Sequence, residues 1–567
     1  MFPALMKKPR RWLRFSLLAG LVLLGVTYML RPPPPRGRPA DPPYLTFFLV
    51  DGLSQEVFQR ELAAGRLPHI AQLLAEGLYV EDGIAAFPSM TGYGFYPFLT
   101  GRDAVHSGVL GLRWFRRDAQ EGNFRNYVGR TNVEMNRDMS AEPRTLFECF
   151  PGQHSFSVNS YANRGVVRNE ILGWAFSIAK YQEQYAALRF LAGTPWLGPR
   201  FMPDWFAAET QTVELAMKDL AFQPKVQWLT LATPDARQHI AGTDETYVAL
   251  VRHADSLIGR YRAESRRLGQ EEHRVYAVIS DHGVTDVKHN VDLRKALGAA
   301  GLSAWRGEAT NLSRTRLDEP VSTWADTDVV LAVNGNTMNY VYLRAEGAGG
   351  AEAWRQRAAP RAAFQQTPLK GGGPVNVVEV LRQVEGVELV VTRADASGEV
   401  RVFSRTGEAR ITPRDGGLAY ACQGEDPLNY ARGEATRHLC DGQPRSAREW
   451  LQATHTTGFP DAVVRLHRLM SAPDVGDLVV TAAPSFDLAA DYELIVGNYR
   501  GGHGGLRADQ LRVPYILAGP GIPAGQRMAT ARAEDIGATL MRLTGCPPAP
   551  NQDGEDLMPS VAGPTPP

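Results

Sequence analysis

Six side chains that could bind metal ions follow apolar runs of the sequence or lie in a glycine-rich loop. They are Asp51, Asp235, His239, Asp281, His282 and His503. Taken singly, such an aspartate is most often a helix cap and such a histidine a surface or core residue. Taken together, carboxylate and imidazole are the ligands that zinc prefers, at about four per ion. Six ligands are too many for one tetrahedral ion and suffice for two, with one further position left for a nucleophile or substrate. Two ions about 4 Å apart form a clamp for in-line phosphoryl displacement.

A hydroxyl-rich loop, residues 86–95, precedes a predicted helix and could supply the nucleophile. It contains Ser89 and Thr91. A metal ion lowers the pKa of such a hydroxyl, and the amides of a helix N-terminus favour an anionic substrate. The structural alternative is that either residue only caps the helix. The metal ligands elsewhere in the chain favour the catalytic interpretation.

The apolar runs themselves predict the elements that must position these groups. Residues 45–50, 226–231 and 275–280 are continuous apolar runs typical of buried parallel strands, and residues 511–518 resemble a late strand of the same sheet. Helical spacing follows in residues 54–77 and again in residues 247–261. Alternation of strand and helix predicts an α/β domain with a mainly parallel sheet, in which ligands bind beyond the carboxyl ends of the strands.

The chain divides into a core, an insertion and two terminal segments. We predict a catalytic α/β core in residues 44–309 and 477–550, interrupted by an α+β insertion or cap in residues 310–476. Within the insertion, Asn334-Gly335-Asn336 predicts a hairpin turn between β-rich runs. The proline-rich residues 551–567 are expected to form a disordered tail.

The N-terminus differs in charge from the rest of the chain. The chain has 61 basic and 61 acidic residues, but residues 1–40 hold eight basic residues and no acidic one. The zero net charge of the whole chain argues against a nucleic-acid-binding surface. Residues 1–14 form a basic segment, the uncharged residues 15–30 a transmembrane anchor or a cleaved signal sequence, and residues 31–43 a proline-rich linker. An anchored protein would carry its catalytic part on the periplasmic or extracellular side, and a cleaved one would be secreted.

Five segments in this order resemble the alkaline phosphatase superfamily, in particular its nucleotide pyrophosphatase/phosphodiesterase (type I phosphodiesterase) branch. They are Leu49–Gly52, Phe87–Thr91, Asp235–His239, Ser280–Gly283 and Gly502–Gly504. The resemblance implies a three-layer sandwich with two bound zinc ions, or other divalent transition metals. It assigns Asp235, His239 and His503 to one ion, and Asp51, Thr91, Asp281 and His282 to the other.

The resemblance also implies the reaction. Thr91 would attack phosphorus as a zinc-bound nucleophile and form a covalent phosphoryl-threonine intermediate, so that the enzyme hydrolyses phosphate esters, most simply phosphodiesters. The ester could be lipid-linked or a nucleotide. Two alternatives use the same site: a transferase that passes phosphoethanolamine or phosphoglycerol to an acceptor, and a phosphomonoesterase. The oligomeric state is left open.

The sequence departs from the family pattern three residues after the nucleophile. An asparagine that binds a phosphoryl oxygen is common there, and this chain has Gly94. Tyr93, Asn163 or Arg164 could supply the missing donor. The segment around Thr91 also lacks the Cys/Ser-x-Pro-x-Arg motif of the formylglycine-dependent sulfatases, which argues against sulfatase activity.

Two further features have a functional and a structural interpretation. Residues 171–206 are rich in aromatic side chains and could form a lid or membrane-resting element, or simply pack as helices. Cys422 and Cys440 lie close in sequence and could pair on the extracytoplasmic side. Cys149 and Cys546 lie in apolar surroundings, where a buried free thiol is the ordinary outcome.

Overall fold

Three neighbouring parallel strands form the centre of the first sheet: β8 (Arg274–Ile279), β1 (Tyr44–Val50) and β7 (Val226–Leu231). The sheet has eight strands in the order β23-β2-β22-β8-β1-β7-β5-β6. The other strands are β23 (Gln526–Arg532), β2 (Gly77–Ile84), β22 (Arg512–Ala518), β5 (Ser155–Val158) and β6 (Arg168–Glu170). Only β22 runs antiparallel to its neighbours in this sheet. The predicted mainly parallel sheet is therefore confirmed.

The computed structural model describes residues 36–117, 124–129, 131–194, 202–310, 321–394, 397–493 and 497–558. Among these residues no helix has the length and apolar character needed to cross a membrane. The predicted basic segment and anchor (residues 1–30) lie outside the described residues, as do residues 31–35 of the linker.

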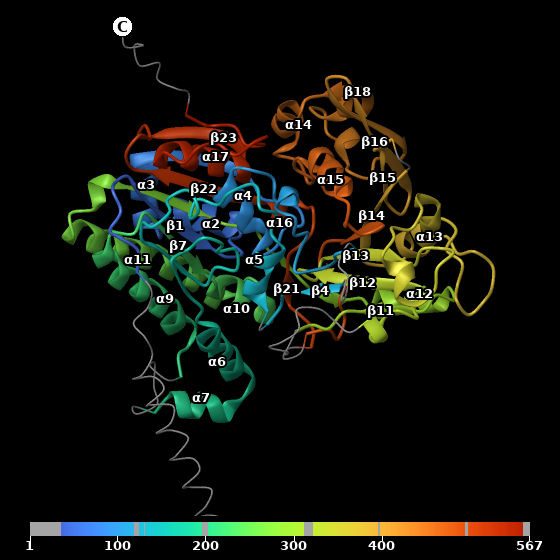
Figure 1. Cartoon of the computed structure of the whole chain (residues 1–567), viewed down its shortest axis with the longest axis horizontal. Helices are drawn as coiled ribbons and strands as arrows, with labels where there is room; N and C mark the ends of the chain where they lie inside the picture. Colours follow the sequence, from blue (N-terminus) through green and yellow to red (C-terminus); the bar gives the residue numbers. More distant parts are fainter. Residues whose placement is uncertain are drawn as a thin grey trace, which may run out of the picture.

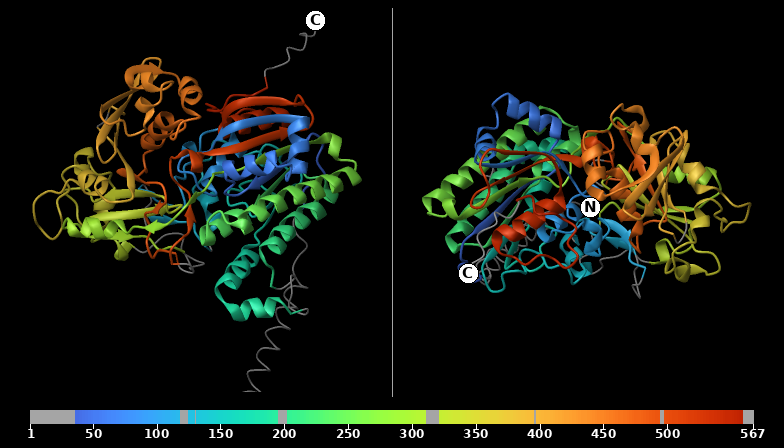
Figure 2. Two further views of the ribbon diagram at one scale, coloured as in Figure 1. Left: turned by 180° about the vertical axis from the view of Figure 1, so that it is seen from behind. Right: turned by 90° about the horizontal axis from the view of Figure 1, so that it is seen from above.

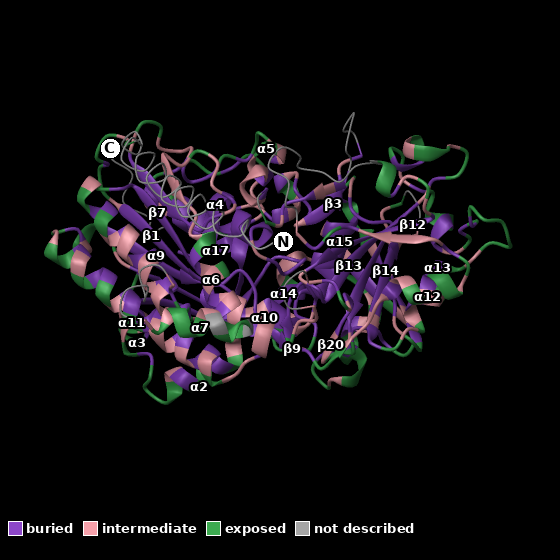
Figure 3. Ribbon diagram, turned by 90° about the horizontal axis from the view of Figure 1, so that it is seen from below, coloured by how far each residue is buried: buried purple, intermediate pink, exposed green. Residues whose placement is uncertain are grey.

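Helices cover both faces of the first sheet and make three layers (Figure 1). Phe48 and Val50 of β1 face the layer that contains α2 (Gln55–Ala63), α3 (Pro68–Glu76), α9 (Trp205–Asp219) and α11 (Glu245–Arg267). Phe47 and Leu49 face α4 (Tyr96–Thr100) and α17 (Ala533–Thr544) on the other side. Because successive side chains of a strand point to opposite faces, a fully apolar run such as β1 needs cover on both. The central strands β1, β7 and β8 are accordingly buried along their whole length (Figure 3).

A second, nine-stranded sheet occupies the insertion and its flanks, with the order β11-β12-β13-β19-β14-β15-β16-β17-β18. Its strands are β11 (Ala304–Arg306), β12 (Val329–Asn334), β13 (Met338–Leu343), β14 (Val387–Arg393), β15 (Val400–Phe403), β16 (Gly407–Arg414), β17 (Gly417–Gly424), β18 (Asp441–Arg445) and β19 (Leu478–Ala482). All pairs except β11 with β12 are antiparallel. The sheet extends beyond residues 310–476 at both ends, since β11 precedes and β19 follows that range.

The two sheets share one apolar core, which joins Trp228 of β7 to Tyr340 of β13. A buried ion cluster adds to this interface: Arg465 of α15 (Ala462–Ser471) lies 2.7 Å from Asp103 and 3.1 Å from Glu534 of α17. Because each buried charge has an opposite partner, the cost of burial is offset only while the insertion and the core stay together. The remaining longer helices are α6 (Gly173–Gln184), α7 (Ala186–Ala192), α10 (Thr233–Ala241), α12 (Leu293–Ala299), α13 (Val377–Arg382) and α14 (Ala447–Thr454).

Short elements connect these parts. They are β3 (Arg113–Phe115), β4 (Phe124–Asn126), α5 (Met135–Asp138), β9 (Thr285–Asp286), β10 (His289–Asn290), β20 (Phe486–Asp487), β21 (Gly501–Gly502) and α16 (Ala508–Leu511).

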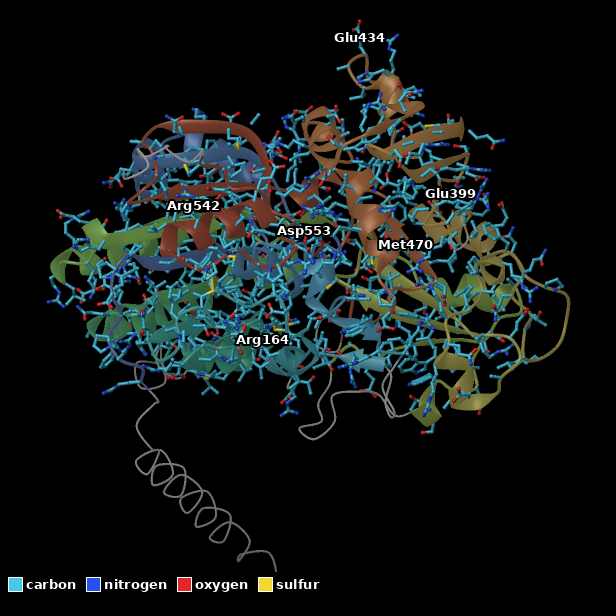
Figure 4. All side chains as sticks on the ribbon, turned by 45° about the horizontal axis from the view of Figure 1, so that its top comes forward. Arg164, Glu399, Glu434, Met470, Arg542 and Asp553 are labelled. Carbon is cyan, nitrogen blue, oxygen red and sulfur yellow. A yellow bond between two sulfur atoms is a disulfide. The ribbon has the colours of Figure 1, made fainter. Side chains whose placement is uncertain are left out.

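The prediction of a disordered tail from residue 551 is wrong for residues 551–558. The Asp553 carboxylate (labelled in Figure 4) accepts hydrogen bonds from the Asp103 amide at 3.0 Å and from Arg102 at 3.3 Å, and Leu557 and Met558 are buried. Proline content alone did not reveal these contacts, which bind this segment to the loop after α4. Residues 559–567 lie outside the described residues.

The cysteine predictions also require correction. Cys149 and Cys546, expected as free thiols, form a disulfide across 397 residues of sequence. Cys422 and Cys440, expected to pair, are free, with their sulfur atoms 2.8 Å apart. The sequence could not reveal the first pairing because only the packing of α17 against α4 brings its end near residue 149.

Candidate metal centre and active site

The carboxyl ends of β1, β7 and β8 bring three of the predicted ligands to one edge of the first sheet. Val50 pairs with Leu231, and Leu49 pairs with Ile279, so the three strands end nearly level. Asp51, Asp235 and Asp281 follow these ends. This is the place where open parallel sheets bind ligands. The hydrophobic register of the strands therefore sets the distance between the three carboxylates.

Two groups of ligands meet there. In the first, the Thr91 hydroxyl lies 3.4 Å from Asp51 Oδ1 and 3.2 Å from His282 Nε2, which is 3.6 Å from Asp281 Oδ2. In the second, Asp235 lies 3.2 Å from His239 Nε2 and 3.7 Å from His503 Nε2. The rings of His282 and His503 stack with their centroids 3.7 Å apart and join the two groups. The structure thus brings together all seven residues predicted to bind metal.

All three histidines are held with the same nitrogen toward the protein backbone. Nδ1 of His239 bonds the Gly501 carbonyl at 2.9 Å, Nδ1 of His282 the Gly283 carbonyl at 3.0 Å, and Nδ1 of His503 the Ser89 carbonyl at 2.8 Å. A carbonyl accepts, so each Nδ1 carries the proton and each Nε2 keeps its lone pair. This is the arrangement in which a histidine binds a metal ion through Nε2.

The carboxylates have unpaired oxygen atoms. Both oxygens of Asp281 and Oδ1 of Asp235 are buried without a hydrogen-bond partner among the described residues. Burial, followed by the charges of Asp281 and Asp235, raises the pKa of Asp51 well above its ordinary value, and burial raises the pKa of Asp281 to about 6. Burial with His282 nearby lowers the pKa of His503. Two divalent cations would satisfy these oxygens and offset the repulsion, so the residues present fit a two-metal centre.

His503 reaches the centre through contacts that sequence spacing does not show. β21 pairs with β9, two residues beyond the segment that carries Asp281 and His282. The His503 amide donates to the Gly335 carbonyl at 3.0 Å, so the predicted hairpin turn at 334–336 of the insertion supports the loop. Gly504 has φ +106° and contacts the backbone of Asn334, a position that a side chain would obstruct. The insertion therefore helps to position a candidate metal ligand.

The surroundings of Ser89 and Thr91 distinguish the two candidate nucleophiles. The Ser89 hydroxyl is buried, donates to the Gly505 carbonyl at 2.9 Å and accepts from the Gly504 amide at 3.0 Å. The Thr91 hydroxyl instead faces Asp51 and His282 and lines a pocket. The Ser89 hydroxyl is therefore engaged with the loop of His503, whereas the Thr91 hydroxyl is open to the pocket.

The three predicted substrate contacts point elsewhere. Tyr93 is buried in the apolar core and donates to the Phe87 carbonyl at 3.3 Å. The side chain of Asn163 donates to the Ser160 carbonyl at 2.8 Å, and Arg164 (labelled in Figure 4) pairs with Glu148 at 2.9 Å. None of the three lines the pocket, so these predictions are wrong. Gly94 contacts the backbone of Asp281, and a Cβ there would lie 3.0 Å from it.

The pocket in front of Thr91 has a volume of about 250 Å³ and contains groups that sequence reasoning missed. Besides the metal ligands its lining includes Tyr161, Phe176, Lys180, Asn336 and Tyr499. The Tyr499 ring stacks on His239 at 4.0 Å, and Lys180 Nζ lies 5.5 Å from the Tyr499 ring centroid. Burial lowers the pKa of Lys180. No motif marks these residues; only the i, i+4 spacing of Phe176 and Lys180 hints at a shared face.

A three-layer sandwich with a histidine–carboxylate centre at its strand ends defines a hydrolytic enzyme of the alkaline phosphatase type. The chain belongs to the type I phosphodiesterase/nucleotide pyrophosphatase family, whose profile matches residues 45–361, more than half of its length. The predicted family and superfamily are therefore confirmed, and phosphodiester hydrolysis is the supported class of activity.

Solved structures agree with this fold. Human ectonucleotide pyrophosphatase/phosphodiesterase 5 is 11% identical, with 90% of this chain and 97% of that chain covered and a TM-score of 0.50. The murine protein is 12% identical, with 89% and 96% covered and a TM-score of 0.50. At this identity the likeness extends to the fold alone. No curated protein sequence matches the chain.

Proposed function

We propose that this protein is a two-zinc phosphodiesterase that uses Thr91 as its nucleophile. The observation that carries the proposal is the convergence of three carboxylates and three Nε2 atoms at one edge of the sheet, with the Thr91 hydroxyl beside Asp51 and His282. Asp51, Asp281 and His282 would hold one ion together with Thr91, and Asp235, His239 and His503 the other. When bound, the ions would lower the pKa of the hydroxyl and offset negative charge on the phosphoryl oxygens.

The residues of this chain have separate tasks in the reaction. The Thr91 oxygen attacks phosphorus and forms a phosphoryl-threonine, the first ester alcohol leaves, and water then releases the phosphomonoester. Asp51 and His282 lie within 3.4 Å of the Thr91 hydroxyl and orient it toward the pocket. Tyr161 and Phe176 line the same pocket and can contact an ester group. Ser89 and Gly335 hold the His503 loop and act as positioning residues.

Lys180 replaces the phosphoryl-oxygen donor that Gly94 lacks. No hydrogen bond or ion pair of its ammonium group occurs among the described residues, and the group faces the pocket beside Tyr499. Since a hydrogen bond to a charged group contributes about 1.5–3 kcal/mol, Lys180→Met should lower kcat/KM for a diester roughly 10- to 100-fold. Lys218→Met removes an exposed lysine of α9 and is the matched control. Equal activity of both variants and the wild type would show that Lys180 does not contact the phosphoryl group.

A substrate panel tests the reaction class. With zinc present, we expect hydrolysis of bis(p-nitrophenyl) phosphate at least about tenfold faster than hydrolysis of p-nitrophenyl phosphate, because the second ester group can occupy the pocket beside Phe176. A faster monoester reaction would instead identify a phosphomonoesterase. Transfer of the phosphoryl group to an added sugar rather than to water would identify a transferase.

We also place the catalytic part outside the cytoplasm. The disulfide between Cys149 and Cys546 is typical of an oxidising compartment. The uncharged run of residues 15–30, flanked by basic residues, remains a predicted anchor or signal sequence. Both observations favour an extracytoplasmic enzyme.

A further inference from the structure

Helix α6 presents three different faces, and only one of them packs against the protein. Ala175, Ala179 and Gln182 are buried. Phe176 and Lys180 line the active-site pocket. The third face consists of Trp174, Ile178 and Tyr181, which at i, i+4 and i+7 fall within about 60° of one another on a helix. The C-cap residue Tyr185 continues it, with its ring centroid 6.1 Å from that of Tyr181. All four are half-buried or exposed. Trp174, at 46%, and Tyr185, at 54%, are the most exposed side chains of this apolar stripe.

Helix α7 continues the apolar surface. Phe190 is 77% exposed and Leu191 is 40% exposed. With Trp174 and Tyr185 they make four of the five large apolar side chains that are exposed in the described part of the chain. The fifth, Leu369, is 47% exposed and belongs to the insertion. Such clustering within α6, α7 and the residue between them differs from the scattered apolar residues of an ordinary surface.

The α6–α7 hairpin (residues 173–192) and the start of the described chain lie on the same side of the molecule. Figures 1 and 2 show both helices extending from one side of the core, and the first described residues lie on that side. Six peptide bonds separate Leu30, the end of the predicted anchor, from Arg36. The distance between the Cα atoms of these two residues is therefore at most roughly 20 Å. A bilayer that held the anchor would therefore face the hairpin.

We propose that the apolar surface of the α6–α7 hairpin rests on a lipid bilayer and admits lipid phosphodiesters to the pocket. The side chains suit this occupant, since tryptophan and tyrosine favour the membrane–water interface, and Arg189 of α7 provides positive charge toward phosphate head groups. A second copy of the chain is a poorer occupant, because four side chains offer far less than the area of about 800 Å² per partner that a stable dimer buries.

The same helix connects the bilayer to the chemistry. On α6, the outward stripe and the pocket face are adjacent, so a head group that leaves the bilayer along the hairpin meets Phe176 and Lys180 first. This inference rests on the proposed phosphodiesterase function and specifies its substrate class: a diester with one lipid alcohol. Cleavage is hydrolytic and needs water as the only co-reactant.

Paired substrates test the inference on the full chain reconstituted in vesicles of phosphatidylethanolamine and phosphatidylglycerol. The variant Phe190→Asp/Leu191→Asp places two carboxylates on the proposed contact, and Leu369→Asp changes an exposed apolar residue of the insertion. We expect the first variant to cleave vesicle lipid at least about tenfold more slowly than wild type while its rate on bis(p-nitrophenyl) phosphate changes less than twofold. Leu369→Asp should match wild type on both substrates.

The outcomes separate the two proposals. Unchanged lipid cleavage by the α7 variant, or an equal loss in Leu369→Asp, would overturn the membrane contact. A wild-type dimer in detergent, detected by sedimentation, would also overturn the membrane contact if the α7 variant were monomeric under the same conditions. A wild-type protein that cleaves the soluble diester but no vesicle lipid would overturn the inference and leave the phosphodiesterase intact. A protein that cleaves neither substrate would overturn the proposed function itself.

Discussion

Replacing Thr91 by alanine is expected to reduce phosphodiester turnover by at least about 10³-fold while the protein keeps its metal ions. The reason is that the proposed mechanism makes the Thr91 hydroxyl, which lines the pocket, the group that forms the covalent intermediate. It faces Asp51 at 3.4 Å and His282 at 3.2 Å, and neither of these needs the hydroxyl to hold its place. His282 is fixed by the Gly283 carbonyl, and Asp51 by the end of β1.

Three comparisons make this result specific. Thr91→Ser keeps a hydroxyl at the same position and should retain measurable turnover. Zinc content by atomic absorption should be equal in wild type and Thr91→Ala, which excludes loss of the metal centre as the cause. Rapid acid quenching should trap a phosphorylated chain in the wild type and none in Thr91→Ala. Full activity of Thr91→Ala would identify Ser89 as the nucleophile instead, although two hydrogen bonds occupy the Ser89 hydroxyl.

The positions of most candidate metal ligands were predictable because they depend on rules that act along the chain. A buried parallel strand has an uninterrupted apolar run, and ligand sites occur at its carboxyl end, so Asp51 and Asp281 could be placed from the sequence. Asp235 and His239 are one helical turn apart, and α10 does bring them within 3.2 Å. His503 could be assigned only by resemblance, since its position depends on the pairing of β21 with β9 and on support from the insertion.

The substrate contacts could not be predicted, because they depend on side-chain direction. Tyr93 is two residues from the nucleophile, but the 3₁₀ turn at Tyr93–Phe95 directs its ring into the core. Lys180 and Tyr499 are more than 300 residues apart and meet only in the folded chain. Of the two interpretations of residues 171–206, helical packing is supported by the burial of Ala175 and Ala179 on α6, and the lid or membrane-resting interpretation stays a prediction.

Removing the metal ions is expected to abolish activity, and added zinc should restore it. Wild type should bind close to two zinc ions per chain, and His503→Ala should bind fewer and lose at least about 100-fold in kcat/KM, because its Nε2 lies 3.7 Å from Asp235 in the second group. His289→Ala changes an exposed histidine of β10 and is the matched control, with unchanged metal content and rate. A metal-free protein with full activity would contradict the two-metal assignment.

Thermal unfolding gives a second test of the metal centre. The effect of Asp281→Asn on the melting temperature should reverse direction when zinc is added. Asp51, Asp235 and Asp281 are buried together, and burial raises the pKa of Asp281 to about 6, so at pH 7.5 its charge opposes folding when no cation is bound. Metal-free Asp281→Asn should therefore melt a few degrees above metal-free wild type. With zinc the order should reverse, because wild type gains binding energy that the variant loses. If the variant melted below wild type in both states, Asp281 would contribute to folding without acting through a metal ion. Activity alone could not distinguish that case, because either role would make Asp281→Asn inactive.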